Sequence, residues 1–315
     1  MNCSTDFQAG SKAKCRLEAR WPHRHDVCAT SCFLSRLAGG ARRFFFMSII
    51  RFLRAQWKTW KGAREKKAIL KVKPAATGDI SRTDWPKSLE DPTGFYEQSY
   101  RYFHYRLPQE FKEHRDFFSK ERRGFGEDAF HAMWYFIFNE FKPRDFLEIG
   151  VWRGQTTSLA ALNQRRLGID GTVAGIAPFQ PSGDSSPFHD RALDHRADTL
   201  KNFDAFGLPH PILIQAFSTD EEALEFIRSR EWDCIYIDGD HEYPVAKADW
   251  ENCAPHVKRG GLIVMDDSGL GTKFRAPNFA TAGIEGPSRV LREIDRTQFQ
   301  EILQVGHNRV FQKIA

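Results

Sequence analysis

The chain has 315 residues, of which 28% are charged and 41% hydrophobic, with a formal net charge of +5. No run of about 18 apolar residues occurs, so we predict no membrane-spanning helix. The charge is unevenly distributed. Residues 1–73 hold 17 basic and 4 acidic side chains, and the remainder holds 29 basic and 37 acidic ones. Because the larger part has no basic surplus, we expect no nucleic-acid partner.

Residues 1–46 mix Cys, His, Arg, Ser and Gly without a helical or strand period. We interpret this segment as disordered, or as a start codon assigned too early, since a more regular pattern begins at Met47. Four of the six cysteines lie in the first 32 residues and resemble no disulfide framework, while Cys234 sits in an apolar run. These features favour a cytoplasmic protein in a reducing compartment.

Residues 47–94 form the second predicted segment, a helix followed by a linker. Within residues 47–73, apolar side chains recur at three- and four-residue steps among Lys and Arg. A basic amphipathic helix of this kind either lies peripherally on an anionic membrane or docks on the protein with a solvated basic face. Pro74, Gly78 and Pro86 then indicate the linker.

Residues 95–315 form the predicted catalytic domain. Its first part is rich in aromatic residues, and Phe130, Trp134, Ile137, Phe138 and Phe141 keep helical spacing. We expect a helical lead-in that packs on a sheet, because such a stripe is more often core than cofactor site.

Beyond Lys142, short apolar runs alternate with helix-like stretches, which is typical of a doubly wound α/β fold. The predicted strands are residues 145–149, 171–176, 211–215, 233–237 and 262–265, followed by an antiparallel hairpin of 299–305 and 309–314. We therefore predict a Rossmann-like, mostly parallel sheet with an antiparallel C-terminal strand.

The segment FLEIGVWRGQTTSLAAL places a strand, the acidic Glu148, a turn with Gly150 and Gly154, and a helix in succession. Glycines allow a ligand to approach the backbone, and the helix start offers unpaired N–H groups. The signal is weak alone, because any doubly wound fold needs such turns. The segment also lacks the glycine patterns of dinucleotide-binding and phosphate-binding loops.

Two later strands each end in acidic residues, in YIDGDHEY and IVMDDSG. If these strands are neighbours, Asp238, Asp266 and Asp267 converge at the carboxyl edge where α/β proteins bind ligands. Their hard oxygen ligands suit Mg²⁺ or another divalent cation. The alternative is that they only cap helices and turns. We favour the metal, since three converging carboxylates repel one another unless they are neutralised.

Together, FLEIGVWRGQTT, IDGDHEYPVAKADW and GGLIVMDDSG resemble class I methyltransferases of the family 24 type. This group includes macrocin-type sugar O-methyltransferases and cephalosporin-hydroxylase-like proteins, with catechol O-methyltransferase more distant. The resemblance covers roughly residues 120–315. It implies S-adenosylmethionine as cofactor, held by Glu148, Gly150 and Gly154 and adjoined by Asp238. It also implies metal ligands at Asp238, Asp266 and Asp267, and a general base at Asp240.

One position departs from this pattern. After the second strand the family has an acid that binds the ribose hydroxyls, but this chain reads GIAPFQ, with Ala177 there. Buried hydroxyls without partners cost about 1–3 kcal/mol, so we expect weaker cofactor binding or a changed ligand. Asp184 and Asp198 are the candidates to substitute.

The resulting hypothesis is a metal-assisted O-methyltransferase that acts on a hydroxyl of a small molecule or glycan, with a sugar as the acceptor that the resemblance suggests. Asp240 ranks first as base and His241 second. Antiparallel terminal strands and aromatic lead-in helices also fit a homodimer. Two alternatives stay open: a non-catalytic protein of the same fold, and a metal-dependent hydrolase or hydroxylase.

Overall fold

A computed structural model describes residues 56–72, 74, 77–188 and 190–315. A compact unit extends from Trp57 to Ala315. The segment expected to be disordered, residues 1–46, and the first part of the predicted basic helix lie outside the described residues. In the described part of the chain, no helix is long and apolar enough to cross a membrane.

Seven strands form one mixed sheet in the order β3-β2-β1-β4-β5-β7-β6. Neighbours from β3 to β5 are parallel, and β7 joins β5 and β6 antiparallel. The bounds are β1 Asp145–Ile149, β2 Thr172–Ile176, β3 Ile212–Ile214, β4 Trp232–Ile237, β5 Val257–Met265, β6 Phe299–Val305 and β7 Asn308–Lys313. The predicted fold class and all seven strands are confirmed, although β5 begins earlier than predicted.

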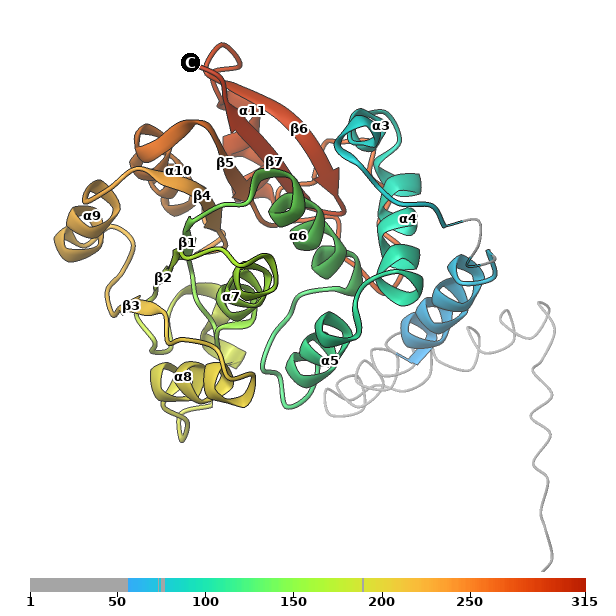
Figure 1. Ribbon diagram of the computed structural model, residues 1–315, viewed down its shortest axis with the longest axis horizontal. Coiled ribbons are helices and arrows are strands. Elements are labelled where there is room, and N and C mark those ends of the chain that lie inside the picture. The colour runs from blue at the N-terminus through green and yellow to red at the C-terminus, as the bar shows by residue number, and fades with distance from the viewer. Residues whose placement is uncertain (1–55, 73, 75–76, 189) are drawn as a thin grey trace, which may run out of the picture. The chain divides into compact units, whose positions relative to one another are not determined.

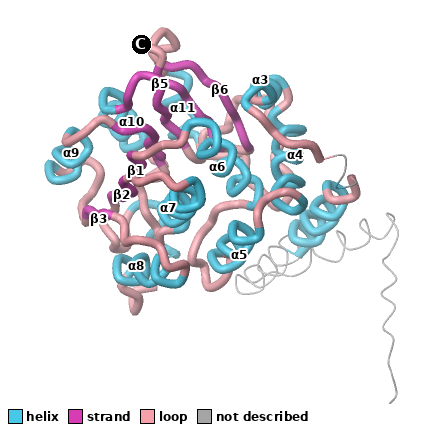
Figure 2. Tube along the Cα trace, in the orientation of Figure 1, coloured by secondary structure: helices cyan, strands magenta, loops and turns pink. Residues whose placement is uncertain are grey.

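Helices cover both faces of the sheet (Figures 1 and 2). Their bounds are α3 Pro86–Glu90, α4 Pro92–Tyr105, α5 Gln109–Phe118, α6 Asp128–Phe141, α7 Gln155–Leu167, α8 His195–Ala205, α9 Glu221–Arg228, α10 Tyr243–Cys253 and α11 Glu285–Glu293. Short 3-10 turns occupy Arg82–Asp84, Gly183–Phe188 and Ala254–His256.

The sheet separates two apolar cores because successive strand residues point to opposite faces. In β1, Phe146 faces the core that contains residues of α4, α6 and α7, whereas Leu147 and Ile149 face the core of α9, α10 and α11. The predicted aromatic stripe lies in the first core. Phe130, Trp134, Ile137 and Phe138 of α6 are buried there, which confirms that the stripe is core packing.

The lead-in is continuous with the catalytic domain. The boundary expected between residues 94 and 95 falls inside α4, and Pro86 of the expected linker opens α3. Trp85 is buried and its ring packs against that of Phe141. The segment is therefore part of the compact unit, because its aromatic residues complete the core on that face.

A chain of buried polar side chains connects the lead-in to the first helix of the sheet domain. His114 Nδ1 lies 3.1 Å from His131 Nε2, and His114 Nε2 lies 2.8 Å from Ser158 Oγ. The Ser158 hydroxyl donates to the Gly154 carbonyl at 2.6 Å. Burial lowers the pKa of His114 to about 3 and lowers that of His131 as well. Both imidazoles are therefore neutral near pH 7.

This burial predicts a loss of stability in mild acid. An unfolded His114 takes up a proton below its ordinary pKa of 6.5, but the folded one does not until about pH 3. The free energy of unfolding should therefore decrease as the pH is lowered below 6.5. At pH 5 this group should account for a loss of roughly 2 kcal/mol. Urea titrations should show a shallower fall for His114→Gln.

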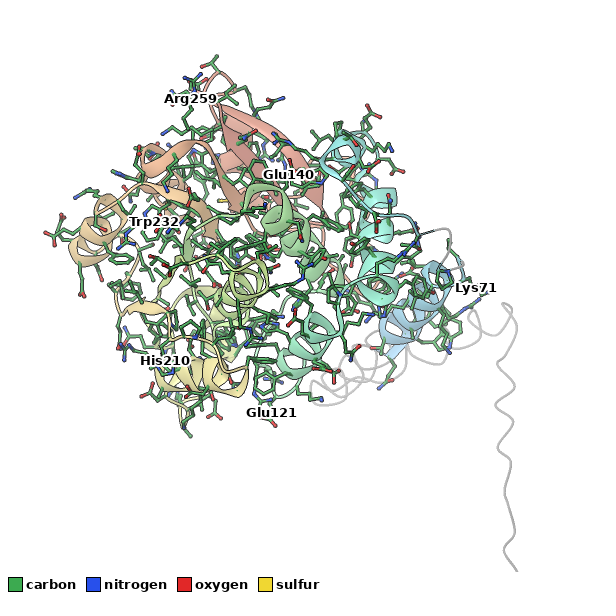
Figure 3. The ribbon with its side chains drawn as sticks, in the orientation of Figure 1. Lys71, Glu121, Glu140, His210, Trp232 and Arg259 are labelled. Carbon is green, nitrogen blue, oxygen red and sulfur yellow. The ribbon has the colours of Figure 1, made fainter. Side chains whose placement is uncertain are left out.

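The control variant is His210→Gln, because His210 is half-exposed and lies on the surface (Figure 3). Its stability should follow the wild-type pH profile. Parallel profiles for wild type and His114→Gln would contradict the prediction.

Candidate functional site

The candidate site lies where the order of the strands reverses direction. β2 and β3 lie on one side of β1, and β4 and β5 continue on the other. In open α/β sheets, ligands bind at this switch point, outside the carboxyl ends of the strands. The turn after β1 and the acidic residues after β4 and β5 meet there, as the sequence analysis predicted.

At Gly150 the turn after β1 lies close against the backbone of Asp238. Its φ of 97° lies in the region that favours glycine, and its N–H donates to the Ile176 carbonyl at 2.9 Å. A Cβ at this position would lie 1.9 Å from the Asp238 carbonyl oxygen. Gly154 also has a positive φ, 81°, and caps the start of α7. Both glycines are therefore required by the geometry of the turn.

Glu148 lies at the end of β1 and is buried. Burial raises the pKa of its carboxyl well above the ordinary value, and the Asp238 charge raises it further. Its Oε2 atom is buried without a hydrogen-bond partner among the described residues. A buried carboxyl oxygen in this state is stabilised by a cationic or hydrogen-bonding ligand.

The three predicted metal ligands converge at the ends of β4 and β5. Ile237 pairs with Met265 in register, so Asp238 and Asp266 follow neighbouring strand positions. Their carboxyls hydrogen-bond to each other, and the Tyr236 hydroxyl donates to Asp238 Oδ2 at 3.2 Å. Burial and the neighbouring Asp266 raise the pKa of Asp238 well above its usual range.

His307 joins this acidic cluster and was missed as a site residue from the sequence, where it was assigned only to the hairpin turn. Its Nε2 lies 3.2 Å from Asp266 Oδ1, and its Nδ1 lies 3.8 Å from Asp267 Oδ1. Burial alone would lower the pKa of His307, but the Asp266 carboxylate opposes it and the value rises to about 10. Burial alone would raise the pKa of Asp266, but the pairing with His307 outweighs burial and lowers the pKa to about 2.

This pairing changes the argument for a metal. The sequence argument required a cation to neutralise three carboxylates, and His307 supplies a positive charge there. In the portion that the structure describes, no three His, Cys, Asp or Glu side chains are arranged to hold one metal ion. The carboxylates keep the right chemistry for Mg²⁺, but their described arrangement does not fit a metal centre.

The two candidate bases take different positions. His241 Nε2 lies 3.4 Å from Asp267 Oδ2 and 3.9 Å from Asp238 Oδ1, within the acidic cluster. Asp240 Oδ1 instead accepts from the Glu242 backbone N–H at 2.9 Å, just before α10, and its other oxygen lies against Gly183. His241 therefore lies within the acidic cluster, whereas Asp240 lies by the loop at Gly183.

The position of the ribose acid and one of its proposed substitutes can be placed in the structure. Ala177 is buried at the end of β2. One oxygen of Asp198, Oδ2, accepts from Arg153 Nε at 2.6 Å and from Asn202 Nδ2 at 3.2 Å. The side chain of Asp184 lies outside the described residues. Ala177 therefore stays a departure from the expected pattern.

Two further acidic residues escaped the sequence analysis. Asp249 of α10 is buried, a Cβ at Gly239 would lie 2.9 Å from its Oδ2, and burial raises its pKa to about 6. Glu127 accepts a short hydrogen bond from the Tyr96 hydroxyl and faces the charge of His307. A charged residue on the apolar side of a helix would have indicated Asp249, whereas no sequence signal indicated Glu127.

Residues 147–268 match a family model described as a methyltransferase domain. The match covers less than half of the chain. The match begins in β1 and ends just after Asp267, so it includes every residue predicted for the site. No curated protein matches the chain.

Solved structures resemble the chain at low identity. An O-methyltransferase from Bacillus cereus in complex with SAH is 14% identical, with a TM-score of 0.48 over 72% of this chain and 100% of that one. A SAH-bound Podospora anserina methyltransferase is 14% identical, with a TM-score of 0.47 over 66% and 89%. An O-methyltransferase of tomaymycin synthesis from Streptomyces achromogenes, in complex with SAM, is 15% identical, with a TM-score of 0.43 over 67% and 92%.

The contact at Gly150 makes a prediction for stability. Gly150→Ala should be strongly destabilising, because the new methyl group overlaps the Asp238 carbonyl at a positive φ. Gly168→Ala is the matched control. Its φ is 64° and no atom lies within 4 Å of the added methyl group.

In urea titrations, Gly168→Ala should lower the free energy of unfolding by about 1 kcal/mol, which is the penalty for an alanine in the left-handed conformation. Gly150→Ala should cost several times more, or prevent folding altogether. Equal losses of unfolding free energy for the two variants would show that the Asp238 carbonyl does not restrict which residue fits at position 150.

Proposed function

We propose that this protein is an S-adenosylmethionine-dependent O-methyltransferase that transfers a methyl group to a hydroxyl. One observation carries the proposal. Glu148 presents a buried, unpartnered carboxyl oxygen beside the glycine turn at the switch point of a methyltransferase domain. The methionine part of S-adenosylmethionine carries an ammonium and a sulfonium, which such an acidic pocket stabilises.

Glu148, Gly150, Gly154 and Asp238 are the residues that would hold the cofactor. The glycines leave room at the backbone, and α7 presents its first N–H groups after Gly154. The bound cofactor supplies an electrophilic methyl group. The protein's own task is to orient the acceptor and to take its proton, since an alcohol does not ionise near neutral pH.

His241 is the base that this proposal favours, with Asp240 as the alternative. After it accepts a proton, the His241 imidazolium would lie beside the Asp267 carboxylate. This charge would stabilise the protonated form and so favour proton removal from the acceptor. Asp240 is oriented by the Glu242 N–H and would act only on an acceptor that reaches the loop at Gly183.

A sugar hydroxyl is the acceptor that we propose, on the basis of the motif resemblance to macrocin-type enzymes. Mg²⁺ assistance remains a prediction from the same resemblance. Oxygen ligands from Asp238, Asp266 and Asp267 support it, whereas the imidazoles that pair with these carboxylates oppose it. A homodimer likewise remains an expectation from the lead-in helices and terminal strands.

A second candidate is a protein of this fold that binds a ligand without catalysis. The observation that favours it is Ala177 at the end of β2 in place of the ribose acid, while Asp198 Oδ2 already accepts from Arg153 and Asn202. Such a protein would bind a ligand other than S-adenosylmethionine.

Calorimetric titration of S-adenosylmethionine tests the proposal and separates the two candidates. The wild type should bind, and Glu148→Gln should bind about tenfold to hundredfold more weakly, because a charge-assisted contact is lost. Glu140→Gln, on the surface, should leave affinity unchanged. Repetition with Mg²⁺, and with Asp266→Asn, tests whether a cation couples to the site. No binding at millimolar cofactor by the folded protein would favour the second candidate.

Methyl transfer tests the base and the acceptor. Radiolabelled S-adenosylmethionine would be incubated with a panel of glycosides and, for comparison, catechols. With an active acceptor, His241→Gln should lower kcat by about 10²- to 10⁴-fold while cofactor affinity stays unchanged. Asp240→Asn should have a smaller effect. The reverse order would assign the base to Asp240, and activity with catechols alone would exclude the sugar.

A further inference from the structure

A basic helix opens the described chain and presents two very different faces. It covers residues 56–69. One face packs against the catalytic domain: Gly62 lies against Phe279, Ile69 is buried, and Glu65 accepts from the Asn278 N–H at 2.6 Å. The Tyr105 hydroxyl donates to the Leu70 carbonyl at 2.5 Å, just after the helix ends. These contacts fix which face of the helix is left outside.

The opposite face carries mainly aromatic and basic side chains, with the small Ala68 exposed among them. Trp57 and Trp60 are about half exposed, at 51% and 48%, although tryptophan is mostly buried in folded proteins. Their rings stack with centroids 5.1 Å apart. Lys61 Nζ lies 5.3 Å from the Trp57 ring, and the Arg64 guanidinium lies 4.7 Å from the Trp60 ring. The Trp face is defined as these four residues together with Lys67 and Lys71.

The charges on this helix are strongly one-sided. Residues 56–72 contain the basic residues Lys58, Lys61, Arg64, Lys66, Lys67 and Lys71, and a single acid, Glu65. That acid binds Asn278 on the inner face, so no carboxylate lies on the Trp face. Helical spacing at 57, 60, 61, 64 and 67 places the tryptophans and three of the cations on one side, and Lys71 follows in the turn after the helix.

We propose that the Trp face binds an anionic membrane surface. Tryptophan rings favour the boundary between lipid headgroups and acyl chains, where one side is apolar and the other wet. Lysine and arginine beside them meet the phosphates of anionic lipids. A purely electrostatic partner would not need two exposed indoles, and a purely apolar one would not need four cations. The proposal is independent of the methyltransferase function, because its residues lie outside residues 147–268.

Vesicle co-sedimentation of the full-length chain tests this proposal. Wild type should bind vesicles of phosphatidylcholine with about one third phosphatidylserine, should bind pure phosphatidylcholine much more weakly, and should dissociate as salt is raised. Trp57→Ala/Trp60→Ala and Lys61→Glu/Arg64→Glu should each lower the partition coefficient by about tenfold or more.

The matched control is Lys201→Glu/Arg259→Glu, which makes the same change in net charge at exposed positions elsewhere in the unit. Figure 3 labels Arg259 well away from Lys71 at the end of the helix. This control should lose little binding. Thermal unfolding should be alike for all variants, since every substituted side chain is exposed.

Three outcomes would overturn the proposal. The first is that both Trp-face variants bind anionic vesicles with the same partition coefficient as the wild type, which would place any membrane contact elsewhere in the chain. The second is equal binding to neutral and anionic vesicles at all salt concentrations. The third is binding to a soluble polyanion such as heparin without binding to anionic vesicles, which would make the partner a polyanion and leave the tryptophans without a role in recognition.

Discussion

The close approach of Gly150 to the Asp238 carbonyl is the constraint on which the site depends. It lets β1 and β4 end side by side at the switch point with no side chain between their last turns. The carboxyl groups of Glu148 and Asp238 are thereby brought into electrostatic contact inside the protein. Two acids this close, and this buried, are unfavourable unless one is protonated or a cation is present. The fold therefore builds a site in which these acids either hold a proton or meet a positive group.

His307 extends this balance to the C-terminal hairpin. Because β7 runs antiparallel to β5, the turn before β7 lies at the end of β5, where Asp266 and Asp267 begin the next loop. The imidazolium there neutralises part of the acidic cluster, so the hairpin has an electrostatic role besides packing. Glu127 also faces His307, and through its bond with Tyr96 it connects the cluster to α4. Lead-in, sheet and hairpin thus meet at one charged centre.

The fold was largely predictable from the sequence because it rests on local patterns. Alternating apolar runs located all seven strands, and the spacing of Phe130 to Phe141 located a core helix. Acidic residues after β4 and β5 were found because strand ends meet at one edge. His307, Glu127 and Asp249 were not, since their roles depend on strand order and helix packing, which no short pattern encodes. The choice between Asp240 and His241 as the base stays a prediction, although the hydrogen bond from Glu242 N–H that orients Asp240 is visible only in three dimensions.

The two halves of the proposed cofactor site would have different physical character. Where the methionine part would lie, the buried carboxyls of Glu148 and Asp238 would become negatively charged beside a cation, in a setting where electrostatic interactions are strong. Where the ribose would lie, Ala177 supplies no acceptor, and Asp198 accepts from Arg153 and Asn202. Affinity in such a site depends mainly on charge and little on recognition of the sugar. The cofactor would lose its sulfonium charge when it gives up its methyl group, but the product would keep its ammonium. A site that lacks the ribose acid but keeps its buried carboxyls should therefore hold the product mainly through this remaining charge.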